Sequence, residues 1–110
     1  MTAVVVREEY GKASGYEALA PTSSTGITAT LLTPTTGVYK GKMAKSALLT
    51  VETFPIRFRQ EGTPTADVGH YVTPGQTITL TGMTNLKNFR CIDTAAGASS
   101  VKVTVFHEGG

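Results

Sequence analysis

The sequence has a single cysteine, no tryptophan and a small share of charged side chains. One cysteine cannot form a disulfide within the chain, so the fold must depend on its core or on its partners. Cys91 follows Phe89 and Arg90 in an alternating apolar run, where a free cysteine is usually a small buried hydrophobe. We therefore expect Cys91 to be buried and unreactive.

Charged residues make up 16% of the 110 residues, against roughly a quarter in a typical domain. The 10 basic and 8 acidic residues are dispersed and give a net charge of +2, so the chain lacks the basic cluster typical of nucleic-acid binding. It has no apolar run of the roughly 20 residues that span a membrane, and no start typical of a secretory signal. We expect no nucleic-acid partner, no membrane partner and synthesis in a cytoplasm.

Sequence signals for catalysis and metal binding are also missing. The two histidines, His70 and His107, have no Cys, His, Asp or Glu at a recognised metal-ligand spacing. The chain contains no G-x-S-x-G motif and no glycine-rich turn leading from a strand into a helix. Acids such as Glu52 and Asp67 are more often solubilising charges on a sheet than a catalytic pair. We expect no enzyme activity, no metal and no cofactor.

What the chain has instead is threonine, serine, glycine and alternating apolar residues, a composition that favours β-structure. Two runs near the middle, 47–52 and 54–59, alternate with a period of two, which is the strand period. We interpret them as a central hairpin-like unit with Phe54 in its core. Because Pro55 removes a ladder hydrogen bond, the second strand should be an edge strand or should begin at Ile56.

Turn residues separate several other apolar runs, and these predict further strands at 27–32, 76–81, 86–92 and 101–106. No stretch is a convincing helix. The expected fold is all-β, a small β-sandwich or jelly roll of six to eight short antiparallel strands over residues 26–110, with a tail from His107. Residues 1–25 are expected to form an extended N-terminal arm that is ordered only against something else. A frayed terminus explains them equally well.

The loop 60–70 contains two glycines, a proline and an aspartate, so we expect a fixed shape that is suited to contacts. Arg57 and Arg59 alternate outward before the loop. With Arg90 they form either a cationic stripe that binds a partner or charges that guard a solvated strand edge. The predicted partner-binding residues are Arg57, Arg59, Thr63, Pro64, Thr65, His70 and Arg90.

Several short motifs stand in residues 44–106, namely the series ALLTVETFPIRFRQEGTPTADVGHYVTPGQTITLTG, the NFRCID that follows it and the final VKVTVF. They resemble a family of small structural proteins encoded beside the capsid genes of tailed bacteriophages. The matching residues are the strand 47–51, Pro55-Ile56-Arg57, Gly62-Thr63-Pro64-Thr65, Gly69-His70, Pro74-Gly75 and Asn88-Phe89-Arg90. The first third of the chain does not contribute to the likeness.

The resemblance implies a virion protein of the head surface, made in the cytoplasm of the host bacterium. Such a protein would be a capsid cement or decoration protein that binds the outside of the major capsid protein lattice, as a homodimer or homotrimer. Two alternatives stay open: a tail or head–tail junction protein, and a carbohydrate- or ligand-binding β-sandwich module. The last requires an aromatic-lined groove, yet most of the 4 Tyr and 4 Phe occupy expected core positions.

Overall fold

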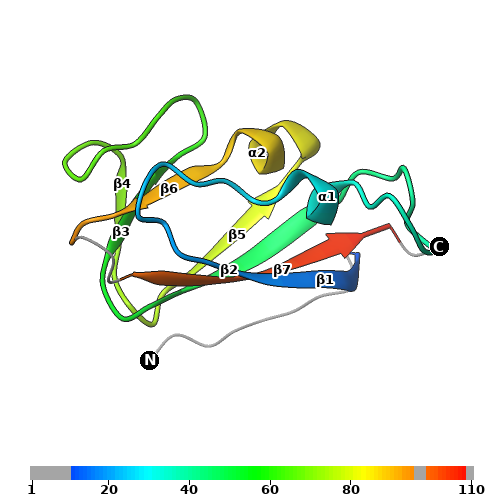
Figure 1. The fold of residues 1–110 in the computed structure, drawn as a ribbon, viewed down its shortest axis with the longest axis horizontal. Coiled ribbons are helices and arrows are strands. Elements are labelled where there is room, and N and C mark those ends of the chain that lie inside the picture. The colour runs from blue at the N-terminus through cyan, green and yellow to red at the C-terminus, as the bar shows by residue number, and fades with distance from the viewer. Residues whose placement is uncertain (1–10, 96–98, 109–110) are drawn as a thin grey trace.

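The structure, a computed structural model, describes residues 11–95 and 99–108. Within these residues the chain forms seven strands in two antiparallel sheets, with two short helices (Figure 1). Side chains from both sheets and from both helices meet in one hydrophobic core. The expected all-β fold of a small sandwich is therefore confirmed.

The larger sheet has four strands, and the last strand of the chain is one of its two central strands. Leu49 illustrates the register, because it lies between Val103 and Ile78 on neighbouring strands and all three side chains are buried. The alternation predicted for 47–52, 76–81 and 101–106 is present. In sheet order the strands are β1 (Lys12–Leu19), β7 (Ser100–His107), β2 (Ser46–Glu52) and β5 (Thr77–Thr81).

The smaller sheet has the order β4 (His70–Val72), β3 (Ile56–Arg59) and β6 (Arg90–Asp93). The outer side of β6 is covered in part by an earlier segment, since Thr25 and Cys91 exchange two backbone hydrogen bonds of 2.9 and 2.8 Å. Covering an edge in this way removes a template for unwanted pairing. Cys91 is buried, as expected.

The prediction that residues 47–59 form one hairpin-like unit is wrong. Its two strands belong to different sheets, because β2 pairs with β5 and β7 while β3 pairs with β4 and β6. Phe54 lies in the crossing between them and is 45% exposed, so it is not a core residue. The second strand does begin at Ile56, one of the two expected outcomes, but it is central in its sheet and not an edge.

Two predicted strands contain helices. Residues 27–32 include α1 (Ala29–Leu32), whose first turn is held by Glu17 of β1. The Glu17 carboxylate accepts hydrogen bonds from the Thr28 amide at 2.8 Å and the Thr28 hydroxyl at 2.5 Å. A contact across 11 residues is invisible to local periodicity.

The segment predicted as a strand at 86–92 covers the end of α2 (Met83–Asn88) and the first three residues of β6. Leu86 and Phe89 are three residues apart and both buried, which is helical spacing. The Asn85 side-chain amide donates to the Thr81 carbonyl at 2.9 Å and ties the helix to the strand before it. The prediction of a chain without helices is therefore wrong.

Part of the expected N-terminal arm is a strand. Residues 12–19 form β1, which pairs along its length with β7, while residues 1–10 lie outside the described part. The expected tail residue His107 is 1% exposed and belongs to β7. It is held there because its Nε2 lies 3.0 Å from the Leu32 carbonyl and 2.9 Å from that of Lys42.

Candidate protein-binding site

The outer face of the smaller sheet carries the arginines predicted to contact a partner. In β3, Ile56 and Phe58 turn toward the core, so Arg57 and Arg59 turn away from it. The register places Tyr71 of β4 directly beside Arg57 on the same face. Residues 60–69, which we call the clasped loop, fold back toward this face.

Arg57 holds the far end of the clasped loop. Its Nε donates to the Ala66 carbonyl and its Nη1 to the Gly69 carbonyl, both at 3.0 Å, and its guanidinium carbon lies 5.0 Å from the centre of the Tyr71 ring. Gly69 has a φ of +130°, and an added Cβ would lie 2.9 Å from the Phe58 carbonyl oxygen. Only glycine fits this close approach without strain.

Arg59 holds the near end of the clasped loop. Its Nε donates to Oε1 of Glu61 at 2.9 Å, and its Nη1 lies 3.4 Å from the Thr63 carbonyl. The hydrogen bond from Arg59 lowers the pKa of the Glu61 carboxyl, with a smaller contribution from the Gln60 amide. Both ends of the loop are therefore tied to β3 by arginine side chains, which supports the expectation of a fixed shape.

The interior of the loop is closed by its own backbone. The Thr65 amide donates to the Val68 carbonyl at 2.9 Å, and the Val68 amide donates to the Thr65 carbonyl at 3.2 Å. The Asp67 amide lies 3.3 Å from the Thr65 hydroxyl. Thr63 and Thr65 are exposed, whereas Pro64 is buried and so offers no side chain to a partner.

His70 does not share the face of Arg57 and Arg59, whereas Arg90 shares it but turns its guanidinium to other partners. His70 is exposed, but the register puts it on the opposite face of β4, where its ring centre lies 5.2 Å from that of Phe58. Arg90 is opposite Arg59 in the register, yet its Nη1 donates to the Lys87 and Phe89 carbonyls at 3.0 and 2.7 Å. Arg90 thus stabilises the end of α2.

Two exposed side chains near the arginines are not among the predicted partner-binding residues. Tyr71 is 53% exposed and stacks on Arg57, and Val68 is 49% exposed in the clasped loop. Tyrosine and arginine are enriched in protein interfaces, and charge-poor apolar patches are typical of their centres. The sequence does not reveal that Tyr71 faces Arg57, because the pairing register of β3 and β4 depends on the length and shape of the loop between them.

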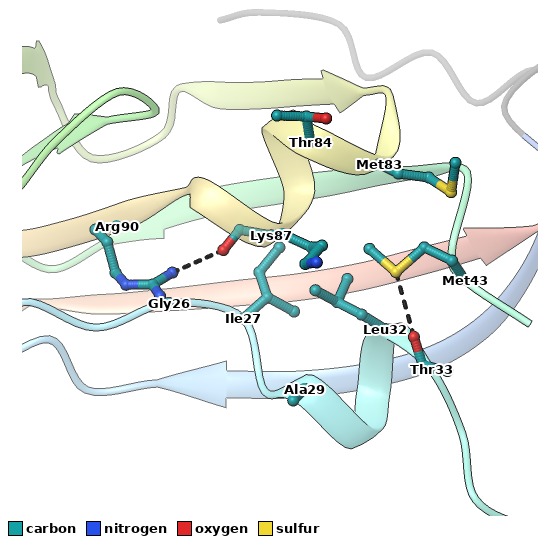
Figure 2. A pocket seen from close by; sticks show the side chains of 10 residues that line it. All are labelled: Gly26, Ile27, Ala29, Leu32, Thr33, Met43, Met83, Thr84, Lys87 and Arg90. Carbon is teal, nitrogen blue, oxygen red and sulfur yellow. Dashed lines mark hydrogen bonds between the residues drawn. The ribbon is translucent and has the colours of Figure 1, made fainter. Parts of the chain in front are cut away.

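A groove of about 880 Å³ lies between α1 and α2 (Figure 2). Figure 2 places the two methionines at one end of it and Arg90 at the other, with Lys87 between them. A smaller polar hollow of about 360 Å³ adjoins Arg90 on the side of the clasped loop. The groove is lined by Gly26, Ile27, Ala29, Leu32, Thr33, Met43, Met83, Thr84, Lys87 and Arg90.

Cys91 is the one cysteine of the described residues, and it is buried. Burial raises the pKa of the Cys91 thiol from 9.0 to about 12, so it is a poor nucleophile near neutral pH. Within residues 11–95 and 99–108, no three His, Cys, Asp or Glu side chains gather to hold a metal ion. The helices of this described part are all too short or too polar to cross a membrane.

Comparisons of the chain with protein-family models, with curated proteins and with solved structures give no match.

Proposed function

We propose that the protein is a non-enzymatic virion structural protein, a head cement or decoration protein that binds the outer surface of the major capsid protein lattice. The observation that carries the proposal is the clasped loop. Arg57 and Arg59 fix both of its ends to β3, while the threonines between them remain exposed. In the proposal this loop, with Tyr71 beside it, makes the capsid contact.

The clasped loop is preorganised for binding. A loop that is already fixed loses less conformational entropy when it binds, so more of its contact energy becomes affinity. Tyr71 beside the loop and Val68 within it supply apolar area, and Arg57 supplies a cation stacked on the tyrosine ring. Binding of this kind needs no cofactor, and many copies on a lattice add modest affinities into a stable coat.

The resemblance to proteins encoded beside tailed-phage capsid genes supplies the partner. The matching motifs include Gly62-Thr63-Pro64-Thr65 and Gly69-His70, which lie in or directly after the clasped loop, and Pro55-Ile56-Arg57, which contains the arginine that holds it. The motifs of the resemblance and the restrained loop therefore coincide in one region of the molecule.

The proposal is tested by sedimenting assembled capsids that lack this protein with the purified full chain. We expect saturable retention on the shells. Replacing residues 65–68 by a Gly-Ser sequence of equal length should leave the fold intact and weaken retention at least about tenfold. The matched control replaces the exposed turn 35–38 in the same way and should retain wild-type binding.

Two results would overturn the proposal. The first is that the wild-type chain sediments no better with capsids than without them. The second is that labelled protein in intact virions is found on the tail and not on the head. The second result favours the tail or junction alternative.

A further inference from the structure

The groove between α1 and α2 has a polarity that points to a particular occupant. Its methionine end is apolar, with Leu32 buried at its wall and Met83 59% exposed. Lys87 lies in the middle of the groove and Arg90 at its other end, and none of the ten lining residues is acidic. Among the described residues no acid forms an ion pair with Lys87. A ligand that is apolar at one end and anionic at the other complements this surface.

The apolar end extends beyond the groove itself. Met43 and Met83 also line a neighbouring hollow of about 410 Å³ at the start of β2. The only acid lining that hollow, Glu108, lies 3.3 Å from the ammonium of Lys45. The two hollows together offer room for an extended peptide segment rather than for a single side chain.

The chain contains one segment with the required sequence. Residues Val4, Val5 and Val6 form an apolar run, and after Arg7 come Glu8 and Glu9. These glutamates are the only adjacent acids among the eight acidic residues of the sequence. An extended segment 4–9 thus presents an apolar end and an anionic end in the order that the groove requires.

The position of Gly11 decides between a segment from the same chain and one from another copy. A Cβ at Gly11 would contact the carbonyl of His107, whose ring bonds to the Leu32 carbonyl next to the methionine end. Glu9 is only two residues from Gly11, and two residues span at most about 7 Å. Within one chain the glutamates would therefore meet the apolar end, and the charges would not match.

We propose that the α1–α2 groove of one copy binds residues 4–9 of a second copy. The valines pack on Met43 and Met83, and the carboxylates of Glu8 and Glu9 lie against Lys87 and Arg90. Reciprocal exchange of two such segments gives a closed dimer, because each copy offers one groove and one segment. The proposal does not depend on capsid binding, since the capsid contact assigned above lies on the outer face of the smaller sheet.

The test uses charge reversal in the full chain. Lys87 is exposed, so Lys87→Glu reverses one charge of the groove without disturbing the core. The double variant Glu8→Lys/Glu9→Lys reverses the segment. Dimer dissociation constants are measured by sedimentation equilibrium at low salt, where ionic contacts are least screened. Each variant alone should dimerise at least about tenfold more weakly than wild type.

The decisive measurement mixes the two variants. In the mixed dimer, one groove of wild-type charge meets a wild-type segment, and the other groove and segment are both reversed. We expect the mixture to form heterodimers close to wild-type affinity although neither variant does so alone. Lys40→Glu, which makes the same charge change on an exposed turn, is the control and should dimerise normally.

Three results would overturn the proposal. The first is a wild-type chain that stays monomeric at every concentration, as binding within one chain predicts. The second is a mixture of the two variants that fails to associate. The third is a Lys40→Glu variant that dimerises as weakly as Lys87→Glu. Circular dichroism melting of each variant establishes that a loss of association is not a loss of folding.

Discussion

Arg59 and Arg90 lie directly opposite each other in β3 and β6, so two like charges face each other across an antiparallel strand pair. Such a pair is destabilising unless each charge has other partners. Arg59 is occupied by Glu61 and the Thr63 carbonyl, and Arg90 by the carbonyls at the end of α2. Arg59 therefore holds the clasped loop, while Arg90 holds the end of α2 and lines the α1–α2 groove.

The first prediction concerns the hold of Arg57 on the clasped loop. Lysine keeps the charge but cannot donate to two carbonyls with a planar fork. Arg57→Lys should lower the free energy of unfolding by about 1 kcal/mol, since two hydrogen bonds at a partly exposed site are lost. It should also speed amide hydrogen exchange of residues 66–69 and weaken capsid retention. Lys40→Ala, a charge change away from the loop, is the control. Unchanged exchange in the loop would contradict the role given to Arg57.

The second prediction concerns His107, which joins three separate parts of the chain. Its Nδ1 is hydrogen-bonded with the Ser14 hydroxyl, its Nε2 bonds the Leu32 and Lys42 carbonyls, and its ring stacks on Tyr39 at 4.7 Å between centres. His107→Phe keeps a ring for the stack but leaves these polar groups without their partner. We expect a loss of about 1–3 kcal/mol in the free energy of unfolding.

Urea unfolding measures this effect. His107→Ala should cost more than His107→Phe because it adds a cavity, and Tyr39→Phe should cost little because the stacked ring remains. A phenylalanine variant as stable as wild type would show that the hydrogen bonds of His107 do not contribute to stability.

The fold class was predictable because it depends on a local signal. Alternation in 47–52, 76–81 and 101–106 gave real strands whose apolar faces are buried. Helix α1 was not predictable, because four residues have no helical period and their start is held by Glu17 from β1. His107 was mistaken for a tail residue for the same reason, since its partners lie 65 and 75 residues away.

The candidate site was predictable in part. The strand period alone places Arg57 and Arg59 on one face, and the glycines and the proline of the loop indicate a fixed shape. The period does not reveal that these arginines bond the loop itself, or that Pro64 is buried. Tyr71 was missed because its neighbour on β3 is set by strand register, which no local pattern specifies.

The third prediction concerns Gly26, which is in close contact with Arg90. A Cβ at Gly26 would lie 2.8 Å from the Phe89 carbonyl oxygen and would collide with Nη1 of Arg90. Gly26→Ala should therefore lower the free energy of unfolding by about 1–3 kcal/mol, since the backbone oxygen cannot move aside. Gly62→Ala is the control, because its Cβ would meet only the flexible guanidinium of Arg59, at 3.0 Å. Equal losses for the two variants in urea unfolding would contradict this account.

The last prediction concerns the buried thiol of Cys91 and the pH dependence of stability. Burial raises its pKa from 9.0 in the unfolded chain to about 12 in the folded protein. A folded-state pKa above the unfolded one means that the stabilising contribution is complete below pH 9 and is lost as the pH rises toward 12. Each pH unit in this interval costs about 1.4 kcal/mol. Lysines and tyrosines also titrate there, so the comparison is with Cys91→Ala.

Between pH 8 and pH 11 the wild type should lose roughly 2–3 kcal/mol more than Cys91→Ala in urea unfolding. A thiol reagent at pH 8 should leave native Cys91 unmodified and react within minutes once the chain is unfolded, because only the unfolded chain has an accessible thiolate. Parallel pH profiles for the two proteins, or rapid labelling of the native thiol, would show that Cys91 is not held in its protonated form by burial.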